Sequence, residues 1–318
     1  MVNGLEPQAV NLINMKWLQL IRWQNLLILA LTLALFKYIL FDTSTGLVLA
    51  LGNLNFVLFV IAVLCIAAGG YIINDIQDIE TDRINKSQRP LVTKSISETQ
   101  AMQAYMIVTI LGVCLGFYLA NVINKSSYAT YFIIIAAALY IYSTGLKQIA
   151  LLGNIVVALI VAFAILLLGI YDIVPVMNSE NQTIQTTFTM LLLDYAIFAF
   201  LINLNREIVK DLEDVDGDYN VGLKTLPIIL GRDRAGNIAF IFSLLPLMAV
   251  VYYTYQYLYQ QPVAVGYFLI FVIAPLIYVS AKCFTASTKT HWAHISEILK
   301  LVMIFGVLSI LLLKWIRL

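Results

Sequence analysis

The chain has 318 residues, of which 61% are hydrophobic and only 12% are charged. Soluble domains carry about 25% charged residues, so this composition excludes an ordinary water-soluble fold and indicates that lipid covers much of the surface. The net charge is only +1, and the sequence contains no basic stripe that could neutralise phosphates. Both observations argue against nucleic acid as a partner.

Nine apolar stretches of about 18 or more residues follow one another along the chain. They lie near residues 18–40, 47–73, 99–121, 127–146, 150–171, 186–206, 235–259, 263–283 and 295–316. No stretch of soluble-domain composition interrupts them. The sequence therefore predicts an all-α polytopic membrane protein with one domain over residues 1–318. We expect about nine helices around a central cavity, with Asp-rich helical caps on the cytoplasmic side.

Lys and Arg residues are distributed unequally between the two sides that these spans define. With a cytoplasmic N-terminus, fourteen fall on the inner side and four on the outer side. Positive residues mark the cytoplasmic side of membrane proteins. We therefore expect an integral protein of a bacterial or archaeal plasma membrane, with the N-terminus and the active site facing the cytoplasm.

The second span ends in an acidic stretch over residues 74–82. Asn74, Asp78 and Asp82 recur there every four residues, a spacing that places side chains along one face of a helix. Basic residues follow this first row closely: Arg83, Lys86, Arg89 and Lys94.

A second acidic stretch, over residues 206–218, follows the sixth span. Lys210, Asp214 and Asp218 repeat the four-residue period, and Asp211 lies beside them. Four spans separate the two stretches, so both are predicted to emerge on the same side of the membrane.

Ten of the 18 acidic residues lie in these two stretches. Like charges at this spacing repel each other on a helix, and more strongly at the membrane edge than in water. Mg²⁺ resolves such a conflict, since it prefers oxygen ligands and is typically held by one or two carboxylates plus substrate phosphates. The rows therefore predict a Mg²⁺ site with these ligands: Asn74, Asp78, Asp82, Asp211, Asp214 and Asp218.

Cations near the rows suit a diphosphate that Mg²⁺ bridges. Arg89, Lys147 and Lys210 are the candidates, and Lys147 ends the fourth span on the same side. His291 and His294, three residues apart in the loop between the last two spans, receive no role.

These residues resemble the UbiA superfamily of intramembrane prenyltransferases. The first row fits its N-x-x-x-D-x-x-x-D signature, and the second row fits K-x-x-x-D-x-x-x-D. Family segments R-P-L and G-x-K-T-L-P match residues 89–91 and 222–227, although Lys94 stands where the family often has Gly. The stretches 146–154 and 206–211 most resemble members that join a geranylgeranyl chain to a glycerol-phosphate ether lipid.

The resemblance implies Mg²⁺-dependent transfer of a prenyl group, expected to be geranylgeranyl, from a prenyl diphosphate to a membrane-associated lipid acceptor such as geranylgeranylglyceryl phosphate. It implies these catalytic residues: Asp78, Asp82, Asp214, Asp218 and Lys210. It implies these substrate contacts: Arg22, Asn25, Arg89, Lys94, Lys147, Asn154, Arg206, Lys224 and Tyr142. A π face could also steady the allylic cation, with Tyr71, Tyr140 and Tyr142 as candidates.

Three alternatives stay open. One is a prenyltransferase that acts on an aromatic quinone precursor, and another is an enzyme that only hydrolyses prenyl diphosphates. The third is a divalent-cation transporter. Transporters tend to place their ligands near the bilayer midplane on broken helices, whereas the acidic residues here lie at the ends of spans.

Overall fold

The computed structural model describes residues 15–85, 91–93 and 95–314, and every structural statement below concerns these residues. Nine of their helical segments are long and apolar enough to cross a membrane. They are Trp23–Thr43, Asn53–Gln77, Glu98–Val122, Ser126–Thr144, Leu152–Val176, Gln182–Val221, Arg232–Leu258, Pro262–Thr285 and Lys289–Leu313. The predicted all-α polytopic architecture is confirmed, with span boundaries that differ by several residues from those predicted.

The chain packs as two compact units. Unit 1 comprises Met1–Ala30 and Asn53–Gly145, and unit 2 comprises Leu31–Gly52 and Leu146–Leu318. The chain passes from unit 1 to unit 2 within α2 (Trp23–Leu35). The single domain expected over the whole sequence stays a prediction.

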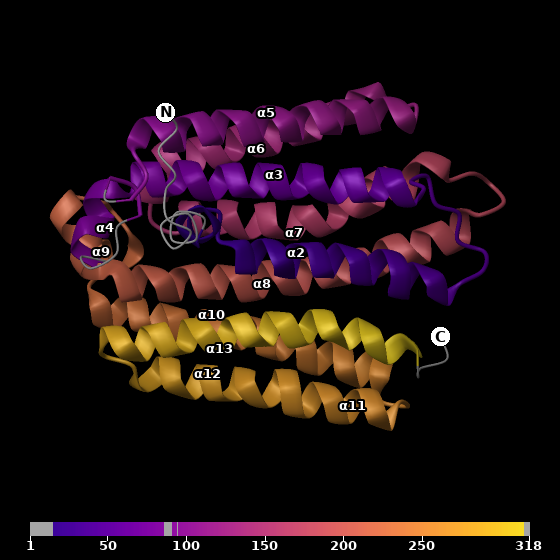
Figure 1. Cartoon of the computed structure of the whole chain (residues 1–318). Helices are drawn as coiled ribbons and strands as arrows, with labels where there is room; N and C mark the ends of the chain where they lie inside the picture. Colours follow the sequence, from indigo (N-terminus) through magenta and orange to yellow (C-terminus); the bar gives the residue numbers. More distant parts are fainter. Residues whose placement is uncertain (1–14, 86–90, 94, 315–318) are drawn as a thin grey trace, which may run out of the picture. The chain divides into compact units, whose positions relative to one another are not determined.

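Unit 1 is built on three long helices, α3 (Asn53–Gln77), α5 (Glu98–Val122) and α6 (Ala129–Thr144), which pack side by side (Figure 1). Small residues on α5 allow this close approach. A side chain at Gly112 would meet Ile66, and one at Gly116 would meet the ring of Phe132. These two glycines therefore allow α5 to pack closely against its neighbouring helices.

The end of α3 is followed by the short helix α4 (Ile79–Asn85). Beside it, a small apolar cluster joins the N-terminal residues of unit 1 to α3 and α5. Its buried members are Leu20, Ile72, Ile76, Val92, Ile96 and Ala101. This cluster fixes the end of α3 that carries the first acidic row.

Unit 2 is a larger helical bundle (Figure 1). Its helices are α7 (Leu152–Asp172), α8 (Gln182–Val221), α9 (Leu226–Leu230), α10 (Arg232–Tyr253), α11 (Pro262–Phe268), α12 (Ala274–Thr285) and α13 (Lys289–Leu308). Two π-helical segments, η6 (Thr254–Leu258) and η7 (Leu269–Ile273), continue α10 and α11. At about 1.5 Å per residue, the 40 residues of α8 span about 60 Å, twice the hydrocarbon thickness. The sixth span therefore continues as a polar helix, as predicted.

Candidate functional site

The first acidic row lies where α3 passes into α4 in unit 1. The Asp78 amide donates to the Asn74 carbonyl oxygen at 2.9 Å, and the Asp82 amide donates to the Asp78 carbonyl oxygen at 2.7 Å. Helical hydrogen bonding thus continues through the short break between the two helices. It keeps the three side chains on successive turns, and Asn74 Nδ2 donates to Asp78 Oδ2 at 2.7 Å.

Asp75, the neighbouring acid, has a different partner. Its Oδ1 lies 2.9 Å from Arg22 Nη2, and the Arg22 guanidinium carbon lies 4.9 Å from the centroid of the Tyr71 ring. The Asn25 backbone amide donates to the Arg22 carbonyl oxygen at 2.8 Å. Arg22, predicted as a substrate contact, therefore pairs with an acid of its own unit.

The second row lies on the C-terminal third of α8 in unit 2. Lys210 Nζ donates to Glu207 Oε1 at 2.7 Å, and Arg206 Nη1 lies 3.7 Å from the same oxygen. The Glu207 carboxylate thus pairs both with Lys210, which was predicted to be catalytic, and with Arg206, which was predicted to contact substrate. Sequence reasoning gave Glu207 no role, although its three-residue spacing from Lys210 is one at which helical side chains meet.

The start of α7 is tied to this row. Asn154 Nδ2 donates to Asp211 Oδ2 at 3.0 Å, and Asn154 is buried. Asp218, seven residues further along α8, is also buried, whereas Asp214 is partly exposed. The structure therefore brings together two residues that were predicted for different tasks, one for substrate and one for metal.

Lys147 and Lys224 lie on two neighbouring turns of unit 2. A short parallel bridge joins Ile149 to Lys224. Lys147 lies in the turn η4 (Leu146–Gln148), which folds back on the first residues of α7. Gly153 permits this close approach, since a Cβ there would lie 2.9 Å from Lys147 Cα.

Several sequence candidates have other positions. Arg89 and Lys94 lie outside the described residues. Tyr142 is half-buried on α6, while Tyr140 stacks on Tyr105 with ring centroids 6.4 Å apart. His291 and His294 contact different groups: the Ser287 amide donates to His291 Nδ1, and His294 Nε2 lies 3.0 Å from the Tyr278 hydroxyl.

Asn205 is a buried polar residue that sequence reasoning missed. It lies on α8 with no exposed surface, and neither of its side-chain polar atoms has a hydrogen-bond partner in the described part of the chain. The Arg206 Nε is also buried without a hydrogen-bond partner in the described part of the chain. Nothing in the sequence pattern distinguishes Asn205, because it lies outside the four-residue period.

The donor atoms of both rows suit Mg²⁺. The side chains at Asn74, Asp78 and Asp82 and at Asp214 and Asp218 offer oxygen atoms. Within the described residues, no three His, Cys, Asp or Glu side chains gather closely enough to enclose a metal ion. Mg²⁺ typically takes one or two carboxylates from a protein and completes its shell with water and substrate phosphates, so an open oxygen-rich row is the kind of site that it uses.

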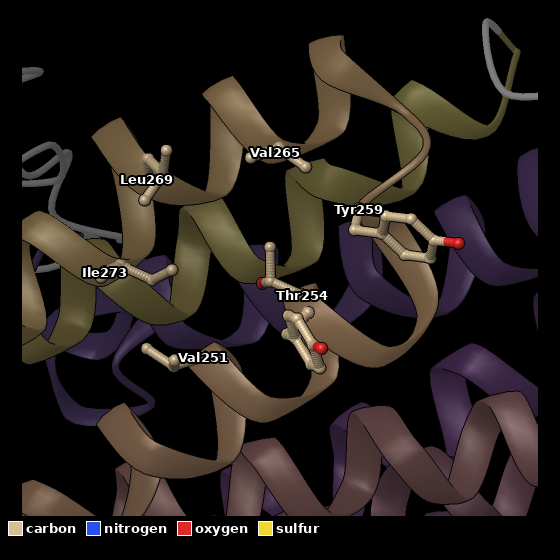
Figure 2. A pocket seen from close by; sticks show the side chains of 7 residues that line it. Val251, Thr254, Tyr259, Val265, Leu269 and Ile273 are labelled. Carbon is tan, nitrogen blue, oxygen red and sulfur yellow. The ribbon is translucent and has the colours of Figure 1, made fainter.

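An apolar pocket of about 270 Å³ opens between α10–η6 and α11–η7 in unit 2. Figure 2 shows its lining, which consists of Val251, Thr254, Tyr255, Tyr259, Val265, Leu269 and Ile273. None of these side chains is an acid or a base that a diphosphate or a metal would need. This pocket therefore does not belong to the candidate site.

Comparison with known proteins identifies the family to which the chain is similar. A model of the UbiA prenyltransferase family matches residues 26–304. Digeranylgeranylglyceryl phosphate synthase of Thermococcus kodakarensis is 30% identical over 252 residues, which cover 79% of this chain and 82% of that protein.

Two solved structures have the same fold. One belongs to a study of digeranylgeranylglyceryl phosphate synthase in membranes, with 25% identity, a TM-score of 0.63, and coverage of 94% of this chain and 98% of that one. The other is a UbiA homologue from Archaeoglobus fulgidus bound to DMAPP and Mg²⁺. It has 18% identity, a TM-score of 0.54, and coverage of 93% of this chain and 99% of that one.

Proposed function

This chain belongs to the UbiA prenyltransferase family, and we propose that it transfers a geranylgeranyl group from geranylgeranyl diphosphate to geranylgeranylglyceryl phosphate, with release of diphosphate. The observation that carries the proposal is the likeness, over most of both chains, to a named synthase of the corresponding digeranylgeranyl lipid. The two acidic rows support it, because each offers oxygen ligands of the kind that bind Mg²⁺.

We assign the binding of the diphosphate to both rows acting together. Asn74, Asp78 and Asp82 would supply Mg²⁺ ligands, as would Asp214 and Asp218, with Asp211 beside them. Bound Mg²⁺ would neutralise the diphosphate and stabilise its charge as it leaves. The Mg²⁺ and DMAPP bound by the Archaeoglobus fulgidus homologue support this choice of metal and donor class.

The chain's own cations would take up the remaining charge. Lys147 and Lys210 would contact diphosphate oxygens, with Arg89 and Lys224 as further contacts. In the reaction, the bond between prenyl C1 and the diphosphate oxygen breaks, and both electrons leave with the diphosphate. The acceptor hydroxyl oxygen then bonds to C1 and releases its proton to solvent, and a π face such as Tyr142 would steady the cation between these steps.

We also propose that the site faces the cytoplasm with the N-terminus on the same side. The excess of Lys and Arg on that side supports this orientation. The isoprenoid tail would then lie among the apolar helices, and the charged diphosphate would reach the rows from the aqueous side.

The test is to incubate membranes containing the protein with labelled geranylgeranyl diphosphate and geranylgeranylglyceryl phosphate, and to identify the lipid product. Asp78→Ala and Asp214→Ala should each lower turnover by at least about 100-fold, as loss of a group that stabilises developing charge does. Glu98→Ala and Asp233→Ala are matched controls, since both acids are exposed and lie outside the rows.

Three results would contradict the proposal. Near-normal activity of Asp78→Ala and Asp214→Ala in the presence of Mg²⁺ would refute the assignment of these residues as metal ligands. If a prenylated product formed only with an aromatic acceptor, the proposed lipid acceptor would be wrong. Release of free prenyl alcohol with no prenylated lipid would identify a hydrolase.

A further inference from the structure

Arg22 has an uncommon backbone conformation. It lies in a two-residue turn between the helical residues 15–20 and α2, and its φ is 50°. Non-glycine residues with positive φ are uncommon because the Cβ crowds the backbone. Such strain persists where surrounding structure holds it in place.

Packing against α3 holds this turn. Leu20, two residues before Arg22, has no exposed surface and packs in the cluster with Ile72 and Ile76. Trp17 and Ile21 pack against the same cluster. The turn is thereby attached to the last two turns of α3, next to the first acidic row.

The Arg22 side chain contacts α3 at two positions one turn apart. Its Nη2 lies 2.9 Å from Asp75 Oδ1, and its guanidinium lies over the Tyr71 ring, with 4.9 Å between the guanidinium carbon and the centroid. The Asp75 side chain is only 9% exposed, whereas that of Arg22 is 32% exposed, so the carboxylate end of the bond is shielded from water. A cation that binds a carboxylate and a ring on the same helix opposes rotation of that helix about its axis.

Rotation of α3 determines where the first row points. Asp75 follows Asn74 by one residue, about 100° around the helix at 3.6 residues per turn, so it lies to the side of the face that carries Asn74 and Asp78. We propose that Arg22 is a positioning residue: by holding Asp75 and Tyr71 it sets the direction in which Asn74 and Asp78 present their oxygens to Mg²⁺ and diphosphate. This inference rests on the proposed function and replaces the substrate contact that the sequence suggested for Arg22.

The test compares Arg22→Ala, Asp75→Ala and the double variant with the natural protein. The measurement is binding of geranylgeranyl thiodiphosphate, an analogue that ionises poorly, as a function of Mg²⁺ concentration. Each single variant should raise the Mg²⁺ concentration for half-maximal binding by about 10- to 100-fold, the usual cost of removing a group that orients a metal ligand. The double variant should be no worse than either single one, since both remove the same interaction.

Two further variants keep the test decisive if Arg22→Ala folds poorly. Arg22→Lys keeps the charge but loses the planar group, so it should rescue only part of the Mg²⁺ response. Gln19→Ala is the control, because Gln19 is an exposed residue in the helical segment just before this turn. It should bind like the natural protein.

A direct substrate contact gives the opposite pattern. Arg22→Ala would then weaken analogue binding at saturating Mg²⁺, Asp75→Ala would bind normally, and their effects would add. Those results would overturn the inference. The proposed function is judged separately, by product formation in the natural protein, because analogue binding requires no acceptor.

Discussion

Lys37 and Asp172 form a buried ion pair within unit 2, with 2.7 Å between Lys37 Nζ and Asp172 Oδ2. Their side chains are 6% and 0% exposed. Lys37 Nζ also donates to the Leu51 carbonyl oxygen, and the Leu51 amide donates to Asp172 Oδ1, both at 2.7 Å. These bonds satisfy both charges and tie the segment 31–52 to the end of α7.

Removing one partner of this pair should destabilise the protein strongly. Lys37→Ala or Asp172→Ala leaves an uncompensated charge in the interior, which typically costs about 3–5 kcal/mol. We expect a clear fall in the melting temperature of the detergent-solubilised protein. Lys125→Ala removes an exposed lysine and should melt like the natural protein. Equal melting of all three variants would show that the pair contributes little.

Gly153 should prove essential for substrate binding rather than for overall stability. A Cβ at this position would lie 2.9 Å from Lys147 Cα and 3.0 Å from the Leu146 carbonyl oxygen. Both are backbone atoms, so Gly153→Ala must displace the turn that carries Lys147. Displacements of about 1 Å at a positioned group can cost 100-fold in rate. We therefore expect a higher KM for geranylgeranyl diphosphate and a lower kcat.

Gly266→Ala is the matched control for this substitution. Gly266 lies within α11, and nothing is found within 4 Å of the position of its Cβ. Alanine favours a helix over glycine by about 1 kcal/mol, so this variant should be fully active and as stable or more so. Unchanged kinetics in Gly153→Ala would mean that Lys147 is not held by this turn.

The membrane architecture could be predicted from the sequence because its cause is local. Each span must satisfy its backbone hydrogen bonds within itself, so apolar length alone reveals a helix. The polar continuation of the sixth span was also predictable, because Lys210, Asp214 and Asp218 repeat at a helical period. Helix α8 indeed continues through that stretch to Val221.

The pairing of charges could not be predicted in the same way. Lys37 and Asp172 are 135 residues apart, and Arg22 and Asp75 are 53 apart. The hydropathy of a span gives neither its rotation nor its neighbours, so neither ion pair was predicted and Arg22 was expected to contact substrate instead.

Glu207 should control the two cations beside it. Because its Oε1 binds Lys210 at 2.7 Å and lies 3.7 Å from Arg206 Nη1, Glu207→Gln keeps the shape but removes the charge that holds both. Charge-assisted hydrogen bonds are about twice as strong as neutral ones, so the cations should lose their fixed positions. We expect kcat to fall about 10-fold in steady-state assays with the protein still folded. Glu297→Gln, on α13, is the control, and equal activity of the two variants would exclude a role for Glu207.

Asn154 should be required as the donor to Asp211 in unit 2. Its Nδ2 donates to Asp211 Oδ2 at 3.0 Å, and Asn154 is buried. Asn154→Ala removes the bond and should lower activity about 10-fold, in the range found when partners that orient metal ligands are lost. Asn154→Asp is more informative, because it places two carboxylates at hydrogen-bonding distance, and like charges this close repel each other.

Divalent cations should relieve that repulsion if the second row binds Mg²⁺. The Asn154→Asp variant should therefore recover activity as Mg²⁺ is raised, whereas Asn154→Ala should not. Asn220→Ala, which changes an exposed residue near the end of α8, should respond to Mg²⁺ like the natural protein. If the Asp and Ala variants show the same Mg²⁺ response, Asp211 lies too far from the bound ion to sense it, and it should be removed from the proposed ligands.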